Sequence, residues 1–134
     1  MSIFLLDTVK KLHIIRIINF MEIEMANVKN APEGRYFSET GWSDAYPWVV
    51  VSSSPSGKTL TLARVDVERD PEWKPIMISG GFSAHCENQQ EQTWLFKSIC
   101  PMSRKTIRLG KNGWAGGKFH ETPKGPFRFY DYNF

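Results

Sequence analysis

The chain has 134 residues, of which 41% are hydrophobic and 23% are charged, and it carries a formal net charge of +3. This length suits one domain, and this balance is typical of a folded globular protein rather than of a disordered, collagen-like or low-complexity chain. Two cysteines are too few for a disulfide scaffold. The composition therefore bounds the fold more tightly than the function.

The N-terminal segment, residues 1–25, differs in composition from the rest of the chain. It is rich in Ile and Leu, but charged residues interrupt every apolar run, which argues against a membrane span. We expect a short helix over residues 3–12. Because Met21 and Met25 are alternative starts, we expect the segment to be an extension that results from an upstream start codon. Its apolar side chains would favour association into a homo-oligomer.

Residues 26–134 are expected to form a single β-rich domain. The stretch 26–45 is rich in Asn, Gly, Pro and Ser, which predicts loop and turn. The clearest element follows, because YPWVVVSSS and TLTLARVDVER are rich in β-branched residues and Pro-Ser-Gly-Lys joins them. This pattern predicts a β-hairpin over residues 46–69.

Later segments predict further strands. They are residues 76–83, which contain a Gly-Gly pair, residues 92–100, residues 104–109, and the aromatic end FRFYDYNF. The sequence Gly-Lys-Asn-Gly at 110–113 predicts a second hairpin turn. Short strands separated by turns are typical of small barrels, so we predict a mainly β fold. It would be a small SH3-like barrel or a curled antiparallel sheet, with a short N-terminal helix or arm.

Two segments carry a resemblance to a known group of proteins. The second of them, from Gly80 to Trp94, reads GGFSAHCENQQEQTW; the hairpin carries Tyr46, Val49, Val50, Ser54, Gly57, Lys58 and Thr59. Together with the FYDYNF end, these segments resemble a loose group of small proteins of phages and other mobile elements. Members of that group pair a Y-x-V-V-x-V-S-x-S-G-K-T hairpin with a G-G-F-x-x-H-x-x-N-x-x-x-Q-x-W segment. Here Pro55 and Ser56 are inserted in the hairpin part, and the resemblance covers about residues 36–134.

The resemblance implies a mobile-element origin rather than a reaction, and small phage proteins of this size often inhibit host systems. We therefore expect a protein without enzymatic activity that binds a host protein or ribonucleoprotein complex in the cytoplasm of the host cell. The expected effect is inhibition of a host defence system, as an anti-CRISPR or other anti-defence protein produces. Large aromatic side chains are common at the centres of protein interfaces. The expected contact residues are Trp42, Tyr46, Trp48 and Trp73.

The basic last third of the chain supports an alternative, nucleic-acid binding. Residues 97–134 hold eight basic and two acidic residues. Cations bind phosphates and flat rings stack on bases, so a small β-barrel with this pattern is a candidate for nucleic-acid binding. Alternate strand positions must also face a core, which leaves only part of the set on one surface. The residues of this alternative are Arg104, Lys105, Arg108, Lys111, Trp114 and Lys118.

A polar cluster after the Gly-Gly pair supports a further alternative. Its uncharged side chains either satisfy loop backbone groups or line a pocket for a small ligand such as a nucleotide, with an enzyme centred on His85 as one version. The residues of this pocket would be His85, Asn88, Gln92 and Trp94. The cysteines and histidines lack the spacing of a zinc site, so we expect no metal and no cofactor.

Overall fold

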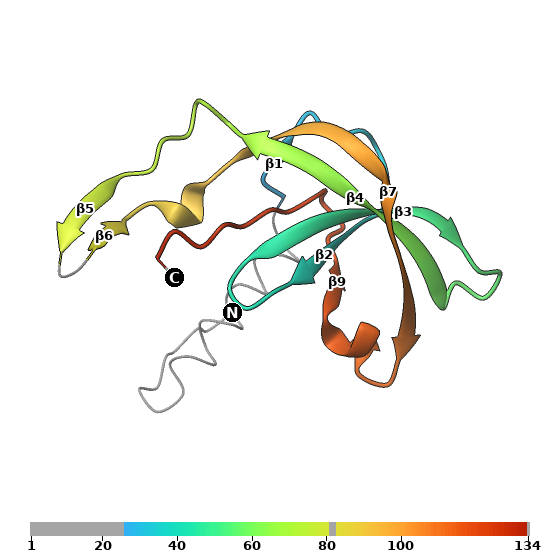
Figure 1. Cartoon of the computed structure of the whole chain (residues 1–134). Helices are drawn as coiled ribbons and strands as arrows, with labels where there is room; N and C mark the ends of the chain where they lie inside the picture. Colours follow the sequence, from blue (N-terminus) through green and yellow to red (C-terminus); the bar gives the residue numbers. More distant parts are fainter. Residues whose placement is uncertain (1–25, 81–82, 134) are drawn as a thin grey trace.

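The computed structural model describes residues 26–80 and 83–133, and the helix expected over residues 3–12 lies outside them. The described chain is mainly β (Figure 1). The strands are β1 (Val28–Lys29), β2 (Tyr36–Thr40), β3 (Ala45–Ser53), β4 (Thr59–Arg69), β5 (Met77–Gly80), β6 (Ser83–Cys86), β7 (Trp94–Gly110), β8 (Gly113–Trp114) and β9 (Phe119–Glu121). Two single 3-10 turns, η2 (Gln89–Glu91) and η3 (Ala115–Gly117), lie between them. None of the helical segments among the described residues has the length and hydropathy to cross a membrane.

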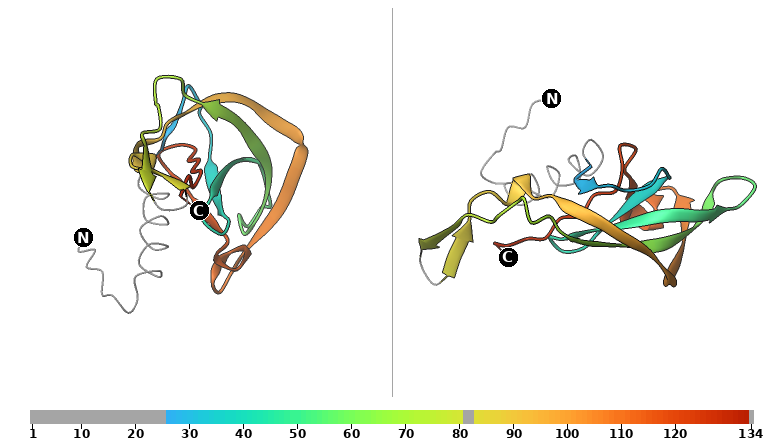
Figure 2. Two further views of the ribbon diagram at one scale, coloured as in Figure 1. Left: turned by 60° about the vertical axis from the view of Figure 1, so that its left-hand side comes forward. Right: turned by 90° about the horizontal axis from the view of Figure 1, so that it is seen from above.

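Seven strands form one sheet that curls on itself, in the order β1-β7-β4-β3-β2-β9-β8 (Figure 2). The sheet closes on itself because β8, the last strand of this order, pairs with β7 as well as with β9. The seam to β7 is short and rests on Leu109 opposite Trp114 and Gly110 opposite Gly113. Strand β1 joins β7 in parallel orientation, which makes the sheet mixed. The predicted mainly β, curled fold is therefore confirmed, with a barrel that is partly closed.

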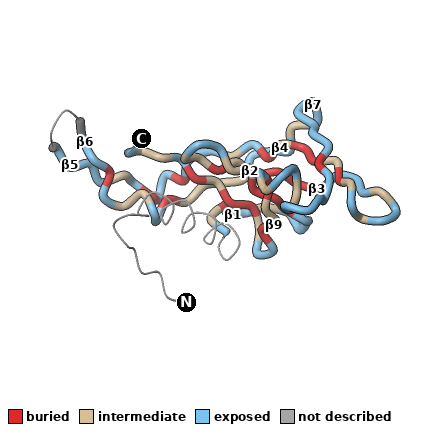
Figure 3. The backbone as a smooth tube through the Cα atoms, turned by 90° about the horizontal axis from the view of Figure 1, so that it is seen from below, coloured by how far each residue is buried: buried red, intermediate tan, exposed pale blue. Residues whose placement is uncertain are grey.

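The core occupies both faces of the curled sheet. Neighbouring residues on a strand point to opposite faces, so Tyr36 and Phe37 on β2 join different clusters. The first cluster contains Phe37, Trp48, Leu60, Leu62, Ile107 and Phe119. The second contains Tyr36, Val49, Ala63 and Val65. Figure 3 shows these buried segments in the body of the sheet and mostly exposed residues in the β5–β6 hairpin.

The hairpin predicted over residues 46–69 is confirmed as β3 and β4. Its turn contains Gly57 at a φ of +75°, a conformation that glycine adopts at little cost. The hydroxyl of Ser54 accepts a hydrogen bond from the backbone N–H of Thr59 at 3.2 Å, which closes the turn. The turn predicted at 110–113 is also present and joins β7 to β8.

The prediction of two separate strands over residues 92–100 and 104–109 is wrong, because both segments belong to the single strand β7. On β4, Ala63 lies opposite Arg104 and Arg64 lies opposite Cys100, so residues 101–103 bulge out of the ladder. Pro101 has no N–H to donate, which suits it to a bulge. The same strand therefore continues on both sides of the interruption.

The loop predicted over residues 26–45 is wrong in part, because β1 and β2 lie within it. Strand β2 forms where Tyr36 and Phe37 find buried positions on the two faces of the sheet, which local turn residues do not reveal. The strand predicted at the aromatic C-terminal end is also wrong. Its one bridge joins Ala45 to Phe129.

Side chains hold this C-terminal tail (residues 127–133) in place of a strand partner. The backbone N–H of Tyr130 donates to Gln92 Oε1 at 2.8 Å, and that of Tyr132 donates to Gln89 Oε1 at 2.9 Å. The N–H of Asp131 donates to Asp44 Oδ1 at 2.8 Å. The tail therefore satisfies its donors without a ladder, which explains why its extended aromatic pattern does not become a strand.

The β5–β6 hairpin, here called the arm, projects from the body of the sheet (Figures 1 and 2). The predicted strand at 76–83 is present as β5, whereas the sequence did not predict β6. At the base of the arm, Asn88 Oδ1 accepts from the N–H of Ile76 at 2.7 Å and Asn88 Nδ2 donates to the carbonyl of Lys74 at 2.9 Å. One amide side chain therefore fixes the direction in which the arm leaves the sheet.

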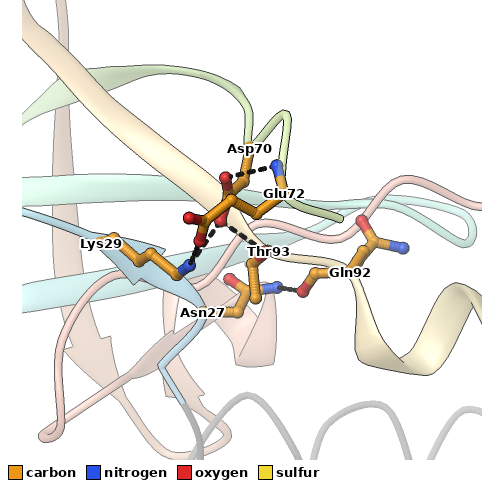
Figure 4. A network of polar contacts seen from close by, with 6 residues as sticks. All are labelled: Asn27, Lys29, Asp70, Glu72, Gln92 and Thr93. Atoms are coloured by element: carbon orange, nitrogen blue, oxygen red, sulfur yellow. Dashed lines mark hydrogen bonds and ion pairs between the residues drawn. The ribbon is translucent and has the colours of Figure 1, made fainter. Parts of the chain in front are cut away.

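A polar network ties β1 to the segment between β4 and β5 and to the start of β7 (Figure 4). Lys29 Nζ lies 2.6 Å from Asp70 Oδ2 and 3.2 Å from Glu72 Oε2. The same Asp70 carboxylate accepts from the Thr93 hydroxyl at 2.9 Å and from the backbone N–H of Glu72 at 2.9 Å. The three contacts to Asp70, from Lys29, Thr93 and the N–H of Glu72, compensate the burial of its carboxylate.

Candidate functional site

Two arginine side chains contact the ring of Tyr46 on β3. The guanidinium carbon of Arg64, on β4, lies 4.4 Å from the ring centroid, and that of Arg128, in the tail, lies 4.7 Å from it. Arg64 lies opposite Trp48 in the β3–β4 register, so it stands diagonal to Tyr46, which shares a face with Trp48. The sheet thus sets one cation–ring pair and the tail adds the other.

The tail holds Arg128 firmly. Its Nη1 donates to the carbonyls of Ala45, at 3.0 Å, and of Phe129. Its guanidinium also lies over the rings of Trp94, at 5.0 Å, and Tyr130, at 5.9 Å. Burial lowers the pKa of Arg128 from its ordinary value, yet an arginine remains protonated at neutral pH. A positive charge is therefore fixed in a half-buried position among aromatic rings.

Two surface pockets lie on either side of Tyr46. One, of about 380 Å³, is lined mainly by Trp42, Asp44, Tyr46, Tyr130, Asp131 and Tyr132. The other, the arginine pocket, has about 370 Å³ and is lined mainly by Tyr46, Arg64, Asp66, Val67, Ser103 and Arg128. Trp42 at the rim of the first pocket is 85% exposed. We define the aromatic–arginine surface as Trp42, Tyr46, Arg64, Arg128 and Tyr130.

A larger pocket, of about 490 Å³, lies between the β1–β2 connection and residues 123–126. Its charged lining residues are Glu33 and Lys124, and turn residues and prolines make up most of the rest. Like charges and rings do not gather there, so the region around Tyr46 is the stronger candidate.

The four residues predicted as a protein-contact surface do not share one. Trp42 and Tyr46 line the same pocket. Trp48 is 4% exposed, packs in the core and donates from Nε1 to Glu39 Oε1 at 3.0 Å. Trp73 is 8% exposed and packs against the ring of Tyr132 at 5.6 Å. Trp48 and Trp73 are therefore corrected from surface contacts to packing residues.

The six residues predicted for nucleic-acid binding also separate. Lys105 and Lys118 lie 3.2 and 3.3 Å from the same carboxylate oxygen of Glu39. Burial alone would raise the pKa of Glu39, but hydrogen bonds from Lys105, Trp48 and Lys118 lower it below its usual value. Trp114 packs edge-on against the Phe37 ring at 5.4 Å. These three residues therefore contribute to the fold, and their role in nucleic-acid binding stays a prediction.

Arg104, Arg108 and Lys111 are exposed. Arg104 and Arg108 are separated by an even number of positions on β7 and face the same way. Lys58 lies beside them, because its carbonyl accepts from the N–H of Leu109 at 2.8 Å. We call Lys58, Arg104, Arg108 and Lys111 the outer cationic strip. None of the four forms an ion pair with any residue that the structure describes.

In the polar cluster predicted as a ligand pocket, the amide side chains bond to backbone groups of neighbouring segments. Gln92, 2% exposed, donates from Nε2 to the carbonyls of Gln89 and Tyr130 and accepts at Oε1 from Trp94 Nε1. Asn88 holds the base of the arm. His85 is exposed on β6 and lies outside the pockets that flank Tyr46. The reading in which these amides satisfy loop backbone is confirmed for Asn88 and Gln92, and ligand binding near His85 stays a prediction.

His85 and Cys86 are neighbours on β6, one exposed and the other buried, so their side chains leave the strand on opposite faces. Over residues 26–80 and 83–133, no three His, Cys, Asp or Glu side chains converge in a way that could hold a metal ion.

Sequence reasoning missed Arg64, Arg128 and Tyr130 as site residues. Arg64 and Arg128 are far apart in the chain and meet only because the tail crosses β3. One local signal pointed to Arg64: it is a charged residue at a position of the predicted hairpin where the alternation of side chains predicts an inward orientation. Comparison with family models, with curated proteins and with solved structures finds no match for this chain. The geometry around Tyr46 therefore carries the functional argument.

Proposed function

We propose that this protein acts by binding a macromolecular partner through the aromatic–arginine surface. The observation that carries the proposal is the meeting of Trp, Tyr and Arg side chains around two pockets that share Tyr46. Trp, Tyr and Arg are the residue types that contribute most binding energy at protein interfaces, and they do so beside pockets that exclude water. Trp42 is the anchor, because it is large and almost fully exposed.

We further propose that the partner is a host protein or ribonucleoprotein complex in the cytoplasm, and that binding inhibits a host defence system. The resemblance of the Gly80 to Trp94 segment and of the β3–β4 hairpin to small mobile-element proteins supports this part of the proposal. Two residues of the aromatic–arginine surface, Tyr46 and Arg64, lie on that hairpin.

An affinity pull-down from host cells, split into nuclease-treated and untreated halves, tests the proposal. We expect one partner to survive nuclease at near-stoichiometric yield, and we expect Trp42→Ala and Tyr130→Ala to lose it. Leu109→Ala is the matched control, because Leu109 is also an exposed apolar residue but lies at the β7–β8 seam. Equal recovery with Trp42→Ala and with wild type would reject this surface as the binding site.

The outer cationic strip favours a second candidate function, nucleic-acid binding. Four cations that form no ion pair in the described part of the chain lie along β7 from Arg104 to the turn that follows it and at the start of β4. Such charges bind phosphates and release counterions.

Binding of a fluorescent single-stranded oligonucleotide at several salt concentrations tests this candidate. If all four cations contact phosphates, the slope of log affinity against log salt is about −3. The double variant Arg104→Glu, Arg108→Glu should abolish binding. Lys97→Glu should retain it, because Lys97 faces Glu68 instead, at 3.9 Å. Retention by the double variant would exclude the strip.

A further inference from the structure

Arg64 and Arg128 both line the arginine pocket, and neither forms an ion pair with any residue that the structure describes. We propose that the arginine pocket binds an oxyanion, either a phosphate or a carboxylate group. The inference rests on the proposed function in one respect, that the oxyanion belongs to the bound partner. The pocket's affinity for a free oxyanion is a property of this chain alone and is measured without the partner.

The hydrogen-bonding capacity of the two guanidinium groups supports the proposal. A guanidinium carries five N–H donors in a planar fork that matches the oxygens of a carboxylate or a phosphate. Arg128 uses only Nη1, for two backbone carbonyls, which leaves Nε and Nη2 to donate. Arg64 has no acceptor for any of its donors in the described chain and makes only ring contacts.

The position of the two cations is set before any ligand arrives. Arg64 is held by the ring of Tyr46 and Arg128 by that ring and by two carbonyls, so little side-chain freedom remains to be lost on binding. Burial is the main cause that lowers the pKa of Arg128, the charge of Asp44 raises it, and the charge of Arg64 lowers it by a smaller amount. The charges of Arg64 and Arg128 therefore repel each other. An anion between them would remove this repulsion. Ser103, from the β7 bulge, adds a hydroxyl donor to the lining.

One acidic residue, Asp66, also lines the pocket. It is exposed and forms no ion pair with Arg64 or Arg128. Its charge weakens the attraction for an anion, so Asp66 distinguishes an oxyanion site from a cation site. Asp66→Asn should strengthen the binding of an anion and weaken the binding of a cation.

Titration of the isotope-labelled full chain with inorganic phosphate, at constant ionic strength, tests the proposal by NMR. We expect saturable shifts at the Nε–H signals of Arg64 and Arg128 and at amides around the pocket. Arg64→Gln should lower the affinity at least about tenfold, because charge-assisted hydrogen bonds are the strong ones. Arg69→Gln is the matched control, since Arg69 is exposed and forms no ion pair with any described residue but lies outside the pocket. Its affinity should equal that of wild type.

A parallel titration with acetate separates the two sources of the oxyanion. Saturation by phosphate alone identifies a phosphate site, and saturation by both identifies a site that also accepts carboxylates. If Arg64→Gln fails to fold, Arg64→Lys replaces it, because lysine keeps the charge but lacks the planar fork. Shifts that never saturate, or that Arg69→Gln weakens as much as Arg64→Gln does, would overturn the site. In that case partner binding by Trp42 is still decided by the pull-down.

Discussion

Asp70 is 2% exposed, yet its carboxylate stays charged because Lys29, the Thr93 hydroxyl and the backbone N–H of Glu72 all contact its oxygens. The hydrogen bond from Lys29 is the largest reason that its pKa lies below the ordinary value, followed by the bond from the backbone N–H of Glu72. A carboxylate whose pKa is lower in the folded state stabilises the fold above the unfolded value, about 3.9. That stabilisation is lost as the pH falls through the lower, folded pKa.

We expect Asp70→Asn to be destabilised at neutral pH and to differ less and less from wild type as the pH falls below about 4. Urea unfolding of both proteins between neutral and acidic pH measures the difference. Burial also lowers the pKa of His120, which destabilises both proteins in acid and cancels in the comparison. Glu72→Gln is the control, because Glu72 is exposed and should change little. A difference for Asp70→Asn that is independent of pH would contradict the assignment.

Gln92 stabilises the tail through one buried amide. Its Oε1 accepts from the N–H of Tyr130 at 2.8 Å, and its Nε2 donates to the carbonyl of Tyr130 at 3.0 Å. Gln92→Leu keeps much of the volume but leaves these backbone groups unsatisfied, so we expect a loss of about 2 kcal/mol or more in the free energy of unfolding. Chemical denaturation measures it. Gln90 is an exposed neighbour, so the free energy of unfolding of Gln90→Leu should stay near that of wild type. An equal loss in Gln90→Leu and Gln92→Leu would show that the amide contacts of Gln92 do not stabilise the fold.

At the scale of elements, the arm depends on its base rather than on its own ladder. A two-stranded hairpin is marginally stable by itself, and four residue pairs join β5 to β6. Asn88 bonds to the N–H of Ile76 and closes the base of the arm, and Asn133 of the tail bonds to the backbone of Cys86 on β6.

We therefore expect Asn88→Ala to open the arm locally while the sheet stays folded. Hydrogen exchange should speed up at the amides of Ile76 and Glu87, whose bonds lie at the base of the arm. Exchange at Leu62 and Val65, in the middle of β4, should stay slow and act as the internal control. A uniform increase at both places would mean that Asn88 stabilises the whole domain instead.

Local chemistry made some elements predictable and left others out. The β3–β4 hairpin was readable because β-branched residues flank a turn with a glycine at positive φ. Strand β2 was not readable, because turn residues surround it and only its burial on both faces makes it a strand. The sequence also did not predict that β7 is one strand. Pro101 is typical of a strand break, but here it lies in a bulge of the continuous strand.

The candidate site was less predictable than the fold, for a related reason. Trp42 and Tyr46 were predicted from residue type, and both line a pocket. Trp48 has the same residue type as Trp42 but lies in the core, because its position on β3 faces inward. The arginine contacts depend on where the tail crosses the sheet, and no short-range pattern encodes that crossing.

At the scale of the whole molecule, the barrel closes through β9 and β8. Phe119 on β9 is buried, pairs with Trp114 on β8 and packs edge-on against Trp48 at 6.0 Å. We expect Phe119→Ala to cost about 3–5 kcal/mol, as for other buried aromatic residues. Thermal unfolding followed by far-UV circular dichroism and by tryptophan fluorescence measures it. Ile76→Ala on the arm, where the side chain is exposed, should cost well under half as much. Similar costs for both would show that the closure adds little.

The residues of the aromatic–arginine surface are synthesised at different times. Tyr46 and Arg64 leave the ribosome seconds before Arg128 and Tyr130, at the usual rate of about 5–20 residues per second. The strands that shape the barrel, up to β9, are all made before the tail. A chain whose synthesis has not reached the tail therefore has Tyr46 and Arg64 but lacks Arg128 and Tyr130. The partner then meets a working surface only on chains whose translation has passed the tail, and stalled products do not compete for it.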